Sequence, residues 1–190
     1  MSLLDVFGFV TGALSVWLCV RKNVWNWPVG IANSAVFLVS FATVGLYADA
    51  ALQIVYVVLG AYGWVYWLRG GDGAHEAPVT RLPAIGIAAA LAFVVLATWL
   101  FAAVLSANFH STVPLWDGLT TALSLAAQFL LSRKVLENWF FWIAADVIYV
   151  PLYAVKGLPL TALLYVIFLA MCVAGAIAWN RSLRARPALA

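Results

Sequence analysis

Aromatic and acidic side chains follow one another at helical spacing in the segment 139–155. Separated by 3, 4, 3 and 4 residues, they share one helical face: Trp139, Trp142, Asp146, Tyr149 and Tyr153. A flat ring could stack on such a face beside the carboxylate, and aromatic faces attract cations by about 0.5–2 kcal/mol. Two alternatives remain open: an aromatic stripe that only packs against other helices, and an Asp146 carboxyl that is protonated or hydrogen-bonded to join two helices. The pattern therefore indicates either recognition of a planar cation or a structural face.

Carboxamide side chains occur inside three other apolar segments. Asn33 lies in the segment 26–44, and Gln53 shares a helical face with Tyr56 in the segment 48–68. Gln128 shares a face with Ser124 in the segment 115–131. An amide both donates and accepts hydrogen bonds, so these groups could hold a carboxamide or sugar hydroxyls. Hydrogen bonding between helices is the alternative role of Gln128.

No grouping of residues suggests catalysis or metal binding. His75 and His110 fall in different loops, and His75 stands beside Glu76 without a further ligand. No nucleophile is paired with a base. The phosphate-binding pattern GxxxxGK[ST] is also missing from the sequence, which speaks against ATP hydrolysis. We therefore expect a protein that is not an enzyme and holds neither a metal nor a cofactor.

The composition decides the broad class of protein. Hydrophobic residues make up 66% of the 190 residues and charged residues 9%, against about 45–50% and 25% in soluble domains. A soluble fold of this size could not bury so large an apolar share. This excludes a soluble enzyme, a disordered chain and a nucleic-acid-binding domain, and it predicts a helical membrane protein.

Seven apolar segments are long enough to cross a hydrocarbon core of about 30 Å, which takes roughly 20 helical residues. We place them at 3–20, 26–44, 48–68, 84–106, 115–131, 139–155 and 159–179. The loop 69–83 is rich in Gly and Pro and is expected to be a flexible link. Of the ten Lys and Arg residues, all but Lys156 fall on the side opposite the N-terminus. Because cytoplasmic loops collect cations, we expect the N-terminus outside and the C-terminus in the cytoplasm.

The chain also repeats itself at an offset of 112 residues. Without gaps, Arg21-Lys22 coincides with Arg133-Lys134, Trp27 with Trp139, and Gly63-x-x-x-Trp67 with Gly175-x-x-x-Trp179. Each unit holds three spans, and the segment 84–106 returns the chain to the starting side. We predict an all-α polytopic membrane protein with seven transmembrane helices as a parallel 3+1+3 repeat. Its parts would be a first three-helix repeat (1–68), a cytoplasmic loop and linker helix (69–114), a second three-helix repeat (115–179) and a basic cytoplasmic tail (180–190). In transporters with such repeats, the substrate binds at the repeat interface near mid-membrane.

Several motifs resemble the PnuC-type vitamin transporters, in order and at matching spacing, over nearly the whole chain except the segment 84–106 and its flanks. The first unit carries Arg21-Lys22-x-x-Trp25-x-Trp27-Pro28-x-Gly30, Leu46-Tyr47-Ala48-Asp49-x-x-Leu52-Gln53-x-x-Tyr56 and Tyr62-Gly63-Trp64-x-x-Trp67. The second carries Glu137-Asn138-Trp139-x-x-Trp142-x-x-x-Asp146 and Lys156-Gly157-Leu158-x-Leu160-Thr161.

The resemblance implies a homotrimer in the inner (plasma) membrane that imports nicotinamide riboside, a precursor of NAD, by facilitated diffusion. Phosphorylation inside the cell would trap the substrate. Thiamine and riboflavin remain alternative substrates, and a substrate-capturing subunit without transport of its own remains an alternative function. The family's pocket lies between the repeats. Motif matching, with Gln128 added from its helical face, gives the expected substrate-binding residues: Trp27, Asn33, Gln53, Tyr56, Gln128, Asn138, Trp139, Trp142, Asp146 and Tyr149.

Overall fold

Seven α-helices make up the part of the chain that the computed structural model describes, which is residues 3–43, 47–70, 76–108, 113–155, 157 and 159–185. Their bounds are α1 Leu3–Val20, α2 Asn26–Thr43, α3 Tyr47–Arg69, α4 Ala84–Asn108, α5 Pro114–Ser132, α6 Asn138–Val155 and α7 Pro159–Arg184. They coincide with the seven predicted spans, and only α7 continues well past its predicted end. The expectations for His75, His110, Lys156 and the end of the tail (186–190) lie outside the described residues.

Four of these helices are long and apolar enough to cross a membrane by length and composition alone. They are α3, α4, α6 and α7, and α1 contributes a shorter apolar stretch, Val6–Val20. Both α2 and α5 fall below that hydropathy because they carry several polar residues. The all-helical membrane fold that the sequence predicts is confirmed.

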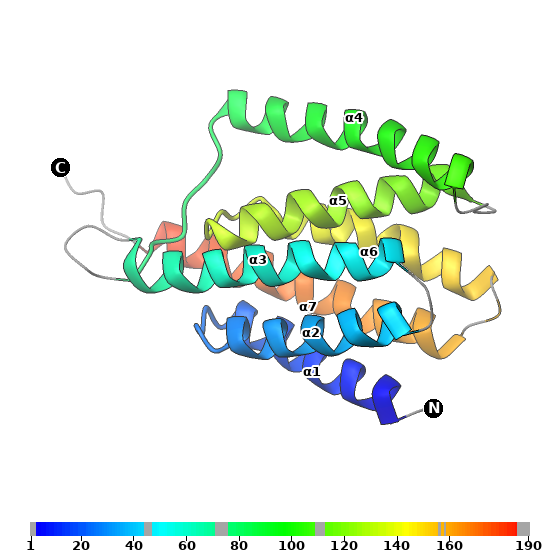
Figure 1. The fold of residues 1–190 in the computed structure, drawn as a ribbon. Coiled ribbons are helices and arrows are strands. Elements are labelled where there is room, and N and C mark those ends of the chain that lie inside the picture. The colour runs from blue at the N-terminus through cyan, green and yellow to red at the C-terminus, as the bar shows by residue number, and fades with distance from the viewer. Residues whose placement is uncertain are drawn as a thin grey trace.

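Six helices pack in a closed ring, in the order α1, α2, α3, α5, α6, α7 and back to α1. The seventh, α4, lies outside the ring and packs on α5 (Figure 1). The ring keeps its order when α1, α2 and α3 are exchanged for α5, α6 and α7. The contact between α1 and α2 then corresponds to that between α5 and α6, and the contact between α3 and α5 corresponds to that between α7 and α1. A duplicated three-helix unit would produce this order. The 3+1+3 division and its boundaries stay a prediction.

The odd-numbered helices run in one direction and the even-numbered helices in the other, so the ends of α1 and α7 nearest the two termini lie at opposite ends of the bundle (Figure 1). This alternation is what successive crossings of a bilayer require. The end at which α1, α3, α5 and α7 finish is called the basic end below, because Arg21, Lys22, Arg69, Arg133 and Lys134 lie there.

The turns after α1 and α5 have the same backbone geometry at the 112-residue offset. Lys22 and Lys134 adopt positive φ angles of 59° and 56°, a region that non-glycine residues enter mainly in turns. At the start of the next helix, Asn26 Nδ2 donates to the Asn23 carbonyl at 2.8 Å, and Asn138 Nδ2 donates to the Val135 carbonyl at 2.6 Å. The matching sequence pattern therefore encodes a matching reversal of the chain.

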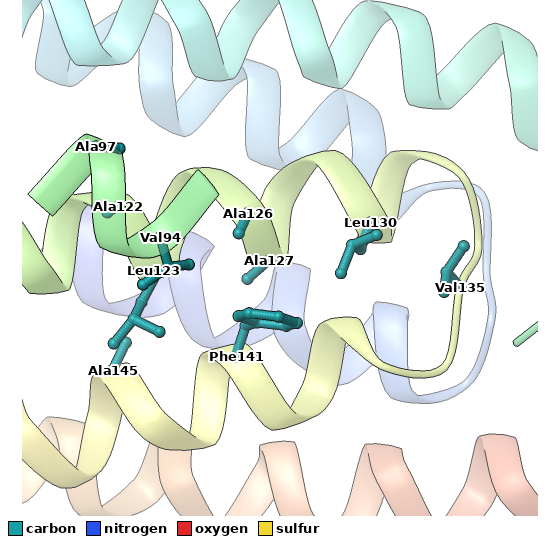
Figure 2. Close-up of a cluster of buried hydrophobic side chains, with 10 residues drawn as sticks. All are labelled: Val94, Ala97, Ala122, Leu123, Ala126, Ala127, Leu130, Val135, Phe141 and Ala145. Carbon is teal, nitrogen blue, oxygen red and sulfur yellow. The ribbon is translucent and has the colours of Figure 1, made fainter. Parts of the chain in front are cut away.

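Small side chains allow α5 to approach its neighbours closely. Ala122 and Ala127 are fully buried, and Figure 2 shows Phe141 of α6 pointing toward α5 beside Ala127. A methyl group at Gly118 would lie only 2.8 Å from the Thr98 carbonyl oxygen of α4. Close contact through small residues is how helices associate within lipid, where burial of apolar surface provides little drive. This packing fixes α4 on the outer side of the ring.

Residues 76–83, expected to belong to a flexible link, are instead held against the basic end. Thr80 N donates to the Lys134 carbonyl at 3.1 Å, and Leu136 N donates to the Thr80 carbonyl at 2.9 Å. Leu82 N donates to Glu137 Oε2 at 3.0 Å, and Arg81 Nε lies 3.9 Å from Glu137 Oε1. Glycine and proline content indicates a loop, but it does not reveal that backbone groups of that loop find partners in the α5–α6 turn.

Candidate functional site

The helix ring encloses a cavity of about 980 Å³. All six ring helices contribute polar side chains to its lining, among them Ser15, Asn33, Gln53, Ser124, Asp146 and Tyr165. Ligand pockets are typically apolar spaces of about 300–1,000 Å³ with a few placed polar groups, and this cavity fits that description. Its place between the helices of the two halves agrees with the location expected for a substrate.

Nine of the ten residues expected from the sequence to bind substrate line this cavity. They are Trp27, Asn33, Gln53, Tyr56, Gln128, Trp139, Trp142, Asp146 and Tyr149. Asn138 does not. Its side chain is fully buried and its amide nitrogen stabilises the α5–α6 turn. The same role of Asn26 at the start of α2 indicates a structural reason for asparagine at both places. Binding of a substrate by the other nine stays a prediction.

Asp146 is buried, with 4% of its surface exposed, and lines the cavity from α6. The Cys172 thiol of α7 donates to its Oδ2 at 3.5 Å. Among the described residues, no Lys, Arg or His forms an ion pair with this carboxylate. An unpaired buried carboxylate within a membrane costs several kcal/mol unless it faces water, a partner or a ligand. The geometry therefore favours a positively charged or hydrogen-bond-donating ligand here.

Three tyrosine rings contact one another at one side of the site, where Tyr149 and Tyr165 line the cavity and Tyr153 packs against them. The ring of Tyr165 of α7 lies 4.5 Å from Tyr149 and 5.2 Å from Tyr153, both of α6, and the latter pair is nearly parallel at 9°. At the corresponding positions of α2, Phe37 and Phe41 stack at 5.7 Å. Aromatic faces of this kind bind flat rings. Because the tyrosines carry hydroxyl groups and the two phenylalanines do not, the cavity suits an asymmetric ligand.

At its basic end the cavity meets four buried tryptophans, called the tryptophan cluster here: Trp27, Trp67, Trp139 and Trp179. Trp27 and Trp67 meet edge to face with centroids 5.4 Å apart, and Trp139 and Trp179 do the same at 5.4 Å. The two pairs touch through Trp67 and Trp179, whose centroids are 5.7 Å apart. Only Trp27 and Trp139 line the cavity, so Trp67 and Trp179 lie beyond its floor.

Two hydrogen bonds tie this cluster across the two halves of the chain. Trp67 Nε1 donates to the Leu131 carbonyl of α5 at 3.1 Å, and Trp179 Nε1 donates to the Cys19 carbonyl of α1 at 3.1 Å. The Lys134 ammonium lies 4.5 Å from the Trp67 ring centroid. Both bonds follow the 112-residue offset, as do the ring contacts, so the cluster is a symmetric contact between α1–α3 and α5–α7.

Two glycines make room for Trp27 and Trp139, the tryptophans that line the cavity. A methyl group at Gly63 would lie 2.5 Å from the Trp27 ring, and one at Gly175 would lie 2.5 Å from the Trp139 ring. Each distance is far below van der Waals contact. Packing therefore explains the GxxxW endings found in the sequence. The glycine of each ending leaves space for the indole of Trp27 or Trp139, and the tryptophan of the same ending contacts that indole edge to face.

Several polar residues of the lining are absent from the expected substrate-binding set, among them Ser15, Tyr165 and Cys172. Tyr165 stands 112 residues after Gln53, so the repeat itself could have indicated it. Cys172 corresponds to Gly60, and no pattern in the sequence connects a cysteine at that position with Asp146.

The model of the nicotinamide mononucleotide transporter family matches residues 2–181. The chain belongs to this family. The nicotinamide riboside transporter PnuC of Escherichia coli (strain K12) is 26% identical over 211 residues, which cover 98% of this chain and 88% of that protein. The riboflavin/roseoflavin transporter RibM of Streptomyces davaonensis is 31% identical over 181 residues, covering 92% and 83%. A crystal structure of the vitamin B3 transporter PnuC aligns with a TM-score of 0.76 and 26% identity over 96% of this chain and 83% of that one.

These matches confirm the PnuC resemblance and place the chain among multi-pass membrane transporters of vitamins. The transporter family is consistent with a protein that is not an enzyme. Its relatives carry names with different substrates, nicotinamide riboside and riboflavin. Membership therefore leaves the choice of substrate to the chemistry of the cavity.

Proposed function

We propose that this protein is a carrier that imports nicotinamide riboside, supplying NAD synthesis, and has no catalytic activity of its own. The observation that carries the proposal is the buried Asp146 carboxylate, which faces the aromatic cavity without a cationic partner among the described residues. Nicotinamide riboside combines a flat cationic pyridinium ring, a carboxamide and a ribose. Each of these groups has a chemical complement in the lining.

The aromatic residues would enclose the ring, with Trp139, Trp142 and Tyr149 around it and Asp146 balancing its charge or accepting from a ribose hydroxyl. Gln53 and Gln128 would bind the carboxamide or the remaining hydroxyls. Asn33 already donates to Thr11 Oγ1 at 2.6 Å. Its amide nitrogen is therefore engaged with α1, and its oxygen is the atom we expect a ligand to use.

The charge of the lining favours the riboside over its phosphorylated form. Among the described residues that line the cavity, the charged ones are Asp49 and Asp146, and none is Lys or Arg. A phosphate group would enter this carboxylate-bearing, lipid-embedded space without a cation to pair with, which is strongly unfavourable. The nucleoside enters and, once phosphorylated in the cytoplasm, cannot return, which gives trapping without any coupling ion.

The tryptophan cluster supports a mechanism in which the two halves of the chain rock about the site. The cavity lining reaches Phe41, Asp49 and Gly157, near the helix ends opposite the basic end. Toward the basic end it includes Cys19, Asn26 and Leu131, whereas Trp67 and Trp179 lie outside the lining. We propose that the structure is the state closed at the basic end. Release there would require Trp67 and Trp179 to separate.

The basic end would face the cytoplasm, because basic residues gather there and cytoplasmic loops collect cations. We propose the inner (plasma) membrane as the location, with the N-terminus outside. A homotrimer is proposed from the family resemblance. The exposed apolar surface of α4, such as Leu96 and Trp99 at 71% and 66% exposure, offers area for lipid or for a second copy.

Riboflavin is the second candidate substrate, since RibM shares 31% identity with the chain over 92% of its length. The isoalloxazine ring of riboflavin is larger than a pyridinium ring and is neutral, so riboflavin would leave Asp146 without an opposite charge. Thiamine carries a cationic ring and is a further alternative, as is a subunit that binds substrate without transporting it.

A thermal-shift screen of the purified protein tests the choice of substrate. Ligand binding raises the melting temperature according to occupancy. We expect the largest rise with nicotinamide riboside, a smaller one or none with riboflavin, and none with nicotinamide mononucleotide. A larger rise with riboflavin than with nicotinamide riboside would overturn the assignment. Binding without uptake by proteoliposomes would support the capturing subunit.

A further inference from the structure

Cys172 of α7 is the one residue that the structure shows hydrogen-bonded to the Asp146 side chain within the described ranges. Its thiol lies 3.5 Å from Oδ2, and both residues are buried at 4% exposure and line the cavity. We propose that Cys172 is a positioning residue that orients the Asp146 carboxylate toward the substrate and thereby sets the preference for cationic over neutral ligands. The ligand preference rests on the proposed function, whereas the thiol–carboxylate contact does not.

The first half of the chain shows that this pair is a specific feature of the second half. At the 112-residue offset, Asp146 corresponds to Ser34 and Cys172 to Gly60. A side-chain carbon at Gly60 would lie 2.9 Å from Ile31 Cγ1, so α2 and α3 leave no room there for a thiol. Around Asp146 and Cys172, α6 and α7 keep that space and fill it with a hydrogen-bond donor. The packing that excludes a side chain in one half is thus replaced by a polar contact in the other.

The chemistry of the contact explains how a thiol influences a ligand that it need not touch. An ionised carboxylate accepts hydrogen bonds only, and a bond to a charged acceptor is stronger than one between neutral groups. A thiol that donates to Oδ2 favours the ionised form and fixes the rotation of the carboxyl group. We expect the other oxygen to be held toward the cavity, where the positive ring of the substrate would bind.

The chain supplies its own control for this proposal. Cys19 is the second cysteine of the sequence, is 3% exposed and lines the same cavity. Cys19 bonds to the tryptophan cluster through its backbone carbonyl, which accepts from Trp179 Nε1 and is retained in alanine. Removing the Cys19 thiol therefore changes a buried cavity-lining thiol without removing the donor to Asp146.

The test compares affinities for nicotinamide riboside and for its neutral reduced form, 1,4-dihydronicotinamide riboside, which has nearly the same shape. Taking the ratio of the two affinities cancels general effects on folding. We expect Cys172→Ala to lower the preference for the cation about tenfold, corresponding to about 1.4 kcal/mol. Cys172→Ser, which restores a donor, and Cys19→Ala should keep the original ratio. An unchanged ratio in Cys172→Ala, or an equal loss in Cys19→Ala, would overturn the proposal.

A second readout needs no ligand. In the Cys19→Ala background, the infrared S–H stretching band belongs to Cys172 alone, and we expect it to move to higher frequency when Asp146→Ala removes the acceptor. A band that does not move would overturn the contact. If the band moves but the unaltered protein does not bind nicotinamide riboside, then the proposed function fails, and the ligand preference fails with it.

Discussion

Replacing Trp67 by phenylalanine tests the closure at the basic end. Trp67 is 1% exposed, touches Trp27 and Trp179, and donates from Nε1 to the Leu131 carbonyl. Phenylalanine keeps an aromatic ring in the cluster but removes the N–H group and part of the ring. The Leu131 carbonyl keeps one bond, because Lys134 N donates to it at 2.8 Å.

The size of the effect follows from these contacts. A lost hydrogen bond in a protein costs about 0.5–1.5 kcal/mol, and the smaller ring forfeits further packing, so we assign about 1–3 kcal/mol to Trp67→Phe. If the contact exists only in the closed state, this amount raises the population open at the basic end about 5- to 150-fold. Trp179→Phe should act similarly, because Trp179 makes the corresponding bond to the Cys19 carbonyl.

The two native cysteines report this opening. Cys19 and Cys172 are the only cysteines of the chain, and both line the cavity while being nearly inaccessible. A membrane-impermeant thiol reagent applied from the basic side should label them slowly in the unaltered protein and about 5- to 150-fold faster in Trp67→Phe. Trp99→Phe on α4, at a side chain 66% exposed and outside the ring, is the matched control. Labelling of Trp67→Phe at the original rate would refute the cluster as the closure.

Three further predictions follow from the site and its packing. Asp146→Ala should weaken nicotinamide riboside binding at least tenfold while the protein is still produced and folded, as measured by calorimetry on purified protein; unchanged affinity would contradict its role as ligand. Gly63→Ala and Gly175→Ala should each lower the melting temperature through overpacking of about 1–3 kcal/mol, since the added carbon lies 2.5 Å from Trp27 or Trp139; a melting temperature equal to that of the parent would show that the indole can move aside. A reporter fused to the C-terminus should signal from the cytoplasm, and an external signal would reverse the proposed orientation.

Much of the fold is readable from the sequence because lipid restricts what a chain can do. Apolar runs of about 20 residues must be helices there, so the seven spans could be placed nearly to the residue. Polar groups inside such runs must face the interior, which is why Asn33, Gln53, Gln128 and Asp146 all line the cavity. Both inferences need only the local sequence and the properties of the lipid bilayer.

The remaining features depend on which helices meet. The contact between Trp67 and Trp179 joins residues 112 positions apart, and the bond from Cys172 to Asp146 joins α7 to α6. Neither can be derived from spacing along one helix. A motif shared with a family put Asn138 among the expected substrate-binding residues, but the motif does not reveal that its amide nitrogen donates within the α5–α6 turn.

Uptake of radiolabelled nicotinamide riboside by proteoliposomes that contain only this protein, measured without a membrane potential, decides whether it is a passive carrier. For facilitated diffusion we expect label to enter until inside and outside concentrations are equal, and a proton gradient alone not to raise the final level. Accumulation above equality when a proton gradient is imposed would contradict facilitated diffusion, and the absence of any uptake by protein that binds the ligand would contradict a carrier.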